Sequence, residues 1–488
     1  MEYTELADYP LPGGTMTGWI PQATQEAWAE DPRRLSYMHS EHALRAHAEG
    51  DSWYSQWIGT AFLIERPLDE DAMTATMTRW YARHEAFRTS VSVDDVRGLT
   101  RITLPADAIS VERRPMGDHL TSTEVFERMN EYFNTTVSPL TWPHCIAVTV
   151  ELADRDDAFL LVFAADHTVM DAYTQVFAIK ELTAIYDSVV TGDPDGLVDF
   201  GSYVDFSDAE RALGDQIRET DDAVAGWSRF FAAADPESPQ PAPMPTFPTA
   251  ISAREAETPS IVAERTPDAG FQATLSSWLL DAQQTAAFNA LCKDAGANMQ
   301  AGIYTALSMT AAALSGSGDL RFLNPIHTRS ELRWGEAAGW FVGIIPVHLR
   351  PRGAATFTEA LASIAASSAE YKKVGAAPFA PIADLIGGDT TPPGFVVSYI
   401  DLRHAEGAAE WDQRQARVLR SSTRNADEVY FWINRVPAGT NISSRFPTGA
   451  RADEVHRFIS TFHRILTTVI AEGDLEYSHA AAHTTNAS

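Results

Sequence analysis

One stretch of the chain decides its fold: AFLLVFAADHTVMDAYTQVFAIKELTAIYDSVV, residues 158–190. It begins with an apolar run, residues 158–165, that is long enough for a buried strand. Beyond Asp171, apolar residues recur at helical spacing from Val176 to Tyr186, which predicts a helix. His167 and Asp171 are therefore expected at a strand-to-helix junction, near the free N–H groups of the helix start.

This placement suits a histidine that acts as a base, because imidazole titrates near neutral pH and can accept and return a proton. A structural interpretation stands beside it. A histidine next to a core strand is usually a hydrogen-bonded structural residue, and Asp171 also fits a helix N-cap. The spacing H-x-x-x-D is short and frequent by chance, so the choice depends on the rest of the chain.

Composition excludes several classes of function. The chain has 488 residues, of which 45% are hydrophobic, so it can bury more than one core and two domains are expected. The net charge of −29 argues against nucleic acid or an anionic membrane as partner. The two cysteines, Cys145 and Cys292, lie far apart and predict neither disulfides nor zinc. Without a signal peptide or a run of about 18 apolar residues, we expect a cytoplasmic protein with no membrane span.

A proline-rich segment divides the chain nearly in half. We predict an N-terminal lobe at 1–234 that carries the H-x-x-x-D motif, a linker at 235–261 and a C-terminal lobe at 262–488. The order of helices and strands is mixed, which predicts an α/β (α+β) protein. No G-x-G-x-x-G loop occurs, so a dinucleotide site is not expected. Residues 1–35 show no clear period and are expected to wrap the surface of the first lobe.

The same patterns predict the remaining elements. Apolar runs bounded by turn residues predict strands at 54–64, 145–152, 321–328, 343–349, 395–402, 428–435 and 440–446. Apolar residues at helical spacing predict helices at 36–48, 69–85, 171–190, 356–373 and 452–471. We also expect an acidic helix that follows residues 201–206 and runs to about 234, and two helices within 281–315. Two histidine pairs, His39/His42 and His479/His483, lack a third ligand, so no metal site is expected.

Four separated motifs carry a family resemblance. They are RHEAFRT at 83–89, DHTVMDA at 166–172, NPIHTRSEL at 324–332 and GWFVGIIPVHLR at 339–350. In this order they resemble the acyltransferase superfamily of chloramphenicol acetyltransferase and nonribosomal-peptide condensation domains. With Asp166 in place of histidine before His167, GSYVDF at 201–206, GWFVGIIPV at 339–347 and SSRFP at 443–447, the chain is most similar to the polyketide-associated acyltransferases of mycobacteria, which acylate trehalose lipid precursors.

The resemblance implies two pseudo-symmetric lobes, each a mostly antiparallel sheet with helices, and a tunnel between them. It implies that His167 is the catalytic base, and that Asp171 supports the site through an ion pair with Arg329. Asp166, Trp340, Ser398 and Tyr399 are expected to contact substrate, and the start of the helix after Asp171 could supply oxyanion donors. Two positions depart from the family pattern: Asp166 stands where the family has histidine, and Ala172 where it has glycine.

The implied activity is transfer of an acyl group from a thioester to a hydroxyl of a sugar, lipid or polyketide. The donor would be acyl-CoA or an acyl carrier protein, with no further cofactor, and the chain is expected to be a monomer. Three alternatives remain open from the sequence. They are amide formation by a free-standing condensation enzyme that meets a peptidyl carrier protein, an inactive recruitment homologue, and a carrier that binds acyl lipid without transfer.

Overall fold

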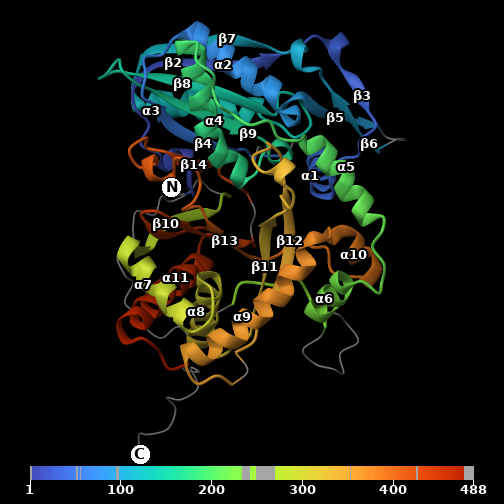
Figure 1. Cartoon of the computed structure of the whole chain (residues 1–488), viewed down its shortest axis with the longest axis vertical. Coiled ribbons are helices and arrows are strands. Elements are labelled where there is room, and N and C mark those ends of the chain that lie inside the picture. The colour runs from blue at the N-terminus through green and yellow to red at the C-terminus, as the bar shows by residue number, and fades with distance from the viewer. Residues whose placement is uncertain are drawn as a thin grey trace, which may run out of the picture.

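The computed structural model describes residues 3–50, 53–54, 56–94, 98–232, 242–248, 270–351, 353–424 and 427–477. Apart from residues 242–248, the predicted linker lies outside the described residues, as does the tail with His479 and His483. Two lobes stand one above the other in Figure 1, each built on its own sheet. The predicted fold class, a mixed helix and sheet protein with two sheet-based lobes, is confirmed.

The upper lobe in Figure 1 contains a seven-stranded sheet with the order β1-β14-β4-β9-β8-β2-β7. All neighbouring strands are antiparallel except β1 and β14. In sheet order, the strands are β1 (Tyr3–Glu5), β14 (Arg417–Arg420), β4 (Ile58–Ile64), β9 (Phe159–Ala165), β8 (Cys145–Leu152), β2 (Gly14–Gln22) and β7 (Ser110–Leu120). A small sheet beside it contains β3 (Ala29–Asp31), β6 (Gly98–Thr103) and β5 (Thr89–Asp94).

Strand β9 shows why the fold-deciding stretch is a continuous apolar run. Alternate side chains of β9 enter two separate cores on the two faces of the sheet, so both kinds of position have to be apolar. One core packs against α2 (Glu70–Arg83) and α4 (Ala172–Thr191), and the other packs against α3 (Ser122–Thr136). The seven-stranded sheet is therefore a central layer, and the end of β9 emerges from between two cores.

The lower lobe is built on a six-stranded sheet with the order β10-β16-β15-β13-β11-β12. Its strands are β10 (Ala273–Asp281), β16 (Gly439–Phe446), β15 (Val429–Val436), β13 (Phe395–Asp401), β11 (Leu320–His327) and β12 (Val342–Leu349). A single large core joins this sheet to α7 (Ala282–Asp294), α8 (Met299–Ser315), α9 (Phe357–Lys373) and α11 (Ala450–Glu472). Helix α8 is buried on all sides, which explains its small, apolar sequence.

Two segments cross between the lobes. Strand β14 lies beyond residue 262 in the sequence, yet it pairs with β1 and β4 in the upper sheet. Helix α6 (Asp222–Phe231) precedes residue 234, yet it packs on α10 (Phe379–Ile386) beside the lower sheet, with the Trp227 and Phe379 rings 4.1 Å apart. The two lobes are thus tied by exchanged elements.

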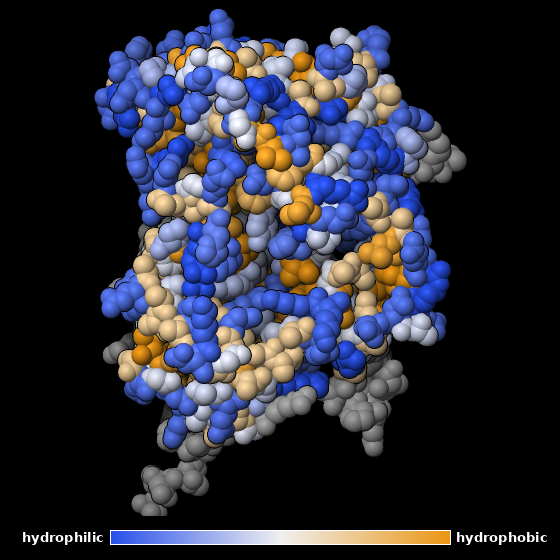
Figure 2. Space-filling model, in the orientation of Figure 1, coloured by the Kyte–Doolittle hydropathy of each residue, from blue (hydrophilic) through white to orange (hydrophobic). Residues whose placement is uncertain are grey.

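The structure corrects two expectations about the N-terminal half. Residues 1–35 do not only wrap the surface, because β2 is an inner strand between β8 and β7 and its Trp19 is fully buried. The single acidic helix expected between residues 201–206 and about 234 is two helices, α5 (Tyr203–Gly214) and α6. The break lets α5 cover α1 (Tyr37–Glu49) while α6 reaches the lower lobe. Figure 2 shows that the face in view is mostly hydrophilic and is hollowed between the lobes.

Candidate functional site at the end of β9

The site begins where β9 leaves the sheet. A single turn of 3-10 helix, η6 (His167–Val169), follows β9, and α4 follows at Ala172. Two aspartates shape this junction. Asp166 accepts a hydrogen bond from the Thr168 amide at 2.9 Å, and Asp171 accepts one from the Thr174 amide at 2.8 Å. Each carboxylate caps a helix start, so the turn that carries His167 is fixed at both ends.

The ring of His167 is held in one orientation and one tautomer. Its Nδ1 lies 3.0 Å from the Met170 carbonyl oxygen, and a carbonyl can only accept, so Nδ1 carries the hydrogen. Nε2 is therefore left with the lone pair. The Trp340 indole stacks on the ring, with centroids 4.7 Å apart and planes 24° apart. Trp340 comes from the lower lobe, just before β12, so His167 lies at the boundary of the two lobes.

The surroundings of His167 favour its neutral form. Burial lowers its pKa to about 4, and His42 acts in the same direction, against the opposing effects of Asp166 and the Met170 carbonyl. A histidine with this pKa is unprotonated at neutral pH, so Nε2 can accept a proton without first losing one. The half-buried ring therefore meets the chemical requirement for a base.

Asp171 and Arg329 join the two lobes through a buried ion pair. The guanidinium binds the carboxylate with two nitrogens, at 2.5 Å from Nη1 and 3.0 Å from Nη2, and the side chains are 1% and 5% exposed. The Phe341 amide donates to the same carboxylate at 3.0 Å, and the Thr174 hydroxyl donates at 2.9 Å. These contacts saturate Asp171, so it supports the site by geometry.

Asp171 also binds one of the N–H groups that were expected to stabilise an oxyanion. Its carboxylate accepts a hydrogen bond from the Thr174 amide, which lies at the start of α4. The Thr174 hydroxyl also lies 3.1 Å from Arg329 Nη2, and it accepts from the Gly339 amide at 3.3 Å. Sequence reasoning did not identify Thr174 as part of the site, because one threonine at a helix start has no distinguishing pattern.

The side chain of Asp166 faces α1. Its Oδ2 lies 3.4 Å from His42 Nε2, and the side chains are 1% and 5% exposed. Burial alone would raise the pKa of Asp166, but His42, the Thr168 amide and His144 together lower it, so the carboxylate is ionised. Sequence reasoning considered His42 only as a metal ligand. The partner of Asp166 lies 124 residues away, and nothing in the local pattern of either residue indicates the pairing.

The remaining predicted substrate residues lie in different places. Trp340 is 9% exposed and covers the ring of His167, as described above. Ser398 and Tyr399 lie on β13 of the lower sheet, where Ser398 is buried and Tyr399 is half-buried. Burial, with Asp401 nearby, raises the pKa of Tyr399 to about 12. The roles of these three residues in substrate binding stay predictions.

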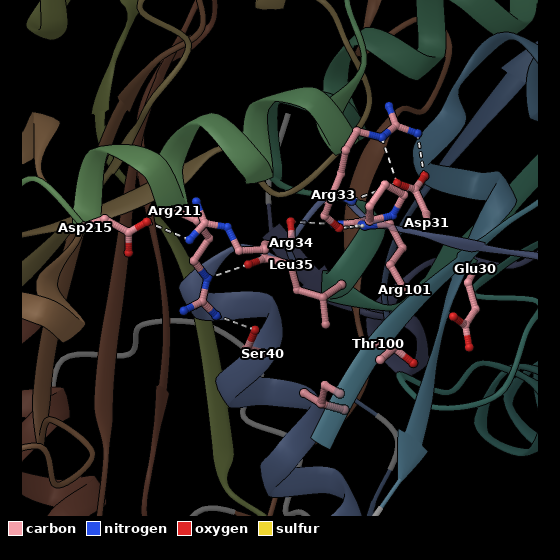
Figure 3. Close-up of a pocket in the computed structure, with 12 residues that line it drawn as sticks. Glu30, Asp31, Arg33, Arg34, Leu35, Ser40, Thr100, Arg101, Arg211 and Asp215 are labelled. Atoms are coloured by element: carbon pink, nitrogen blue, oxygen red, sulfur yellow. Dashed lines mark hydrogen bonds and ion pairs between the residues drawn. The ribbon is translucent and has the colours of Figure 1, made fainter. Parts of the chain in front are cut away.

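A separate pocket of about 590 Å³ lies beside the start of α1, between β3, β6 and α5, and His167 is not among its lining residues (Figure 3). Four arginines line it: Arg33, Arg34, Arg101 and Arg211. Carboxylates already neutralise two of them, since Arg33 binds Asp31 and Glu85, and Arg34 binds Asp208 and Asp215. Arg101 and Arg211 donate to backbone carbonyls of residues 33–36. These bonds give the arginines a structural role in joining α1 to α5 and β6.

Two other kinds of feature are absent from the described residues. They contain no group of three or more histidine, cysteine, aspartate or glutamate side chains that could hold a metal ion. No helix in the described ranges is both long and apolar enough to cross a membrane.

Comparison with known proteins places this geometry in a family. Acyltransferase PapA3 of Mycobacterium tuberculosis (strain CDC 1551 / Oshkosh) is 24% identical over 487 residues, 96% of each chain. Trehalose-2-sulfate acyltransferase PapA2 of Mycobacterium bovis (strain BCG / Pasteur 1173P2) is 23% identical, over 92% of this chain and 93% of PapA2. Both relatives are named acyltransferases and align over more than nine-tenths of their length, which confirms the prediction of an acyltransferase enzyme.

Solved structures show the same fold. A structure described as PapA2 acyl transferase superposes with a TM-score of 0.80 at 20% identity, covering 96% of this chain and all of that one. The Condensation domain family matches residues 45–392, which include the junction at the end of β9 and parts of both lobes. The chain therefore belongs to the Condensation domain family.

Proposed function

We propose that this protein transfers an acyl group from a thioester to a hydroxyl of a sugar acceptor, with His167 as general base. The single observation that carries the proposal is the locked ring of His167. Its Nδ1–H is given to the Met170 carbonyl, so Nε2 is an unprotonated acceptor at the lobe boundary. The relatives PapA2 and PapA1 are named for acylation of sulfated trehalose, which supports a sugar as acceptor.

The proposed reaction needs only one protein group, His167, to accept and return the proton. His167 Nε2 takes the proton of the acceptor hydroxyl while the oxygen attacks the thioester carbonyl carbon. The carbon–sulfur bond of the tetrahedral intermediate then breaks, and the imidazolium returns the proton to the departing thiolate. No covalent bond to the enzyme is needed, because one group can serve as base and then as acid. Asp171 and Arg329 take no proton in this scheme, since they only hold the junction between the lobes.

The proposal is tested by following thiol release. The wild-type protein, His167→Ala and the control His404→Ala would be mixed with acyl-CoAs of several chain lengths, with and without trehalose or trehalose 2-sulfate. His404 is an exposed histidine in the segment between β13 and β14. We expect release that depends on the sugar, a product whose mass includes the acyl group, and loss of both in His167→Ala alone.

Two results would contradict this proposal. Equal turnover by wild-type protein and His167→Ala would exclude His167 as base. Acyl transfer to amines in preference to sugars would replace the ester-forming activity with amide formation. If CoA thioesters give no release, the same comparison is made with an acyl group loaded on a carrier protein, which separates the choice of donor from the identity of the base.

A further inference from the structure

The carboxylate of Asp166, directly before the base in sequence, needs an explanation of its own. It is 1% exposed, and a buried ionised carboxylate is costly unless its oxygens are paired. Oδ1 accepts from the Thr168 amide at 2.9 Å, and Oδ2 lies 3.4 Å from His42 Nε2. A carboxylate only accepts, so the His42 nitrogen that faces it carries a hydrogen. His42 therefore completes the pairing of a group that is one peptide bond from His167.

His42 has a second link to His167, through an indole. Its ring is wedged edge-on between Trp53 and Trp340, with centroid separations of 5.1 Å and 5.6 Å. The face of Trp340 in turn stacks on His167. His42, Asp166, His167 and Trp340 thus form a closed ring of contacts that joins α1, the end of β9 and the lower lobe. A displacement of His42 would release both neighbours of the base together.

We propose that His42 is a positioning residue for His167, which it holds through Asp166 on one side and Trp340 on the other. The expected effect of His42 on kcat rests on the proposed function, whereas its expected effect on the pKa of His167 does not. The contact between His42 and Asp166 involves the position at which this chain differs from the family motif, which has histidine where this chain has Asp166. With a carboxylate at position 166 in place of histidine, a buried hydrogen-bond donor is required, and α1 supplies it.

Several charged groups face His42, and they set the electrostatics of the ring. On α1 itself, Arg45 Nη2 lies 3.5 Å from His42 Nδ1, and buried His39 interacts with it electrostatically. From the strand ends, Asp166 and His144 approach the same region. The contributions to His167 have opposite signs, because His42 lowers its pKa and Asp166 raises it. Removal of His42 should therefore raise the pKa of His167, and removal of the Asp166 carboxylate should lower it.

This contrast provides a test that needs no turnover. Protein labelled with ¹⁵N-histidine would be titrated by NMR, with the His167 signals assigned from their loss in His167→Ala. We expect the pKa of His167 to rise in His42→Gln and to fall in Asp166→Asn. His47→Gln, an exposed histidine on the same helix, is the matched control and should leave it unchanged.

The kinetic arm uses whichever acyl donor proves active. His42→Phe keeps the ring between the two indoles but removes the hydrogen bond to Asp166, and it serves if His42→Gln does not fold. A positioning role predicts a kcat about ten- to a hundredfold lower with KM nearly unchanged. Unchanged titration of His167 in both variants, or shifts in the same direction, would overturn the proposal, even in a protein whose acyl transfer is fully established. Opposite shifts would support it even if no acyl transfer is found.

Discussion

At the scale of single residues, the pair formed by Asp171 and Arg329 makes the sharpest prediction. Asp171→Ala would leave the Arg329 guanidinium buried without its carboxylate, which costs about 3–5 kcal/mol in the free energy of unfolding. The pair is 1% and 5% exposed, so solvent cannot replace the lost partner. Urea denaturation of the wild-type protein and the variant measures the difference. Loss of activity should follow from distortion of the junction.

The control for this experiment is an ion pair of the same type on the surface. Glu370 and Lys373 lie 2.6 Å apart on α9, with side chains that are 61% and 68% exposed. Glu370→Ala should leave the unfolding midpoint nearly unchanged, because exposed pairs contribute little. A small effect of Asp171→Ala, similar to that of Glu370→Ala, would show that the buried pair does not carry stability.

The titration of His167 gives a second prediction at this scale. As the proposed base, His167 can accept a proton only in its neutral form, and its pKa is lowered from 6.5 to about 4. The value of kcat/KM should therefore rise with pH up to about pH 5 and stay level through neutral pH. If the base had the pKa of an ordinary histidine, kcat/KM would fall to half of its maximum at about pH 6.5. A pH–rate profile at low substrate concentration measures this limb, and a midpoint near 6.5 would contradict the assigned environment.

At the scale of elements, β2 shows what one strand contributes. Trp19 is fully buried on β2, and its Nε1–H donates to the Thr149 hydroxyl on β8 at 3.0 Å. Trp19→Ala should lower the free energy of unfolding by about 3–5 kcal/mol, as for other large aromatic residues removed from a core. Trp278→Ala on β10, where the indole is 38% exposed, is the control and should cost far less. Equal effects of the two changes would contradict the inner position of β2.

At the scale of the whole molecule, the exchanged elements predict cooperative unfolding. Residues 1–234 alone would lack β14, which lies between β1 and β4, and α6 would lose its apolar contacts with the lower lobe. We therefore expect the isolated fragment 1–234 to show no cooperative thermal transition, whereas the full chain unfolds in a single transition by calorimetry. Two separate transitions in the full chain, or a cooperatively folded fragment, would show that the lobes are independent.

Local patterns in the sequence predicted the elements that depend on short-range spacing. The strand at 145–152 was predicted at its observed bounds, and the helices at 356–373 and 452–471 lie within two residues of α9 and α11. The junction after β9 was predicted because an apolar run and a helical period meet there. The family motifs also indicated that Arg329, 158 residues away, is the partner of Asp171, where the structure places it.

Tertiary structure alone decided the features that depend on long-range contacts. β2 has no alternating pattern because both of its faces are covered, so its inner position cannot be read from period. β14 has four residues, and its place in the upper sheet is fixed only by the pairing with β1 and β4. The contact of His42 with Asp166 arises because α1 packs against the turn after β9. A short sequence specifies which local conformation is favoured, but which side chains meet depends on how the complete chain packs.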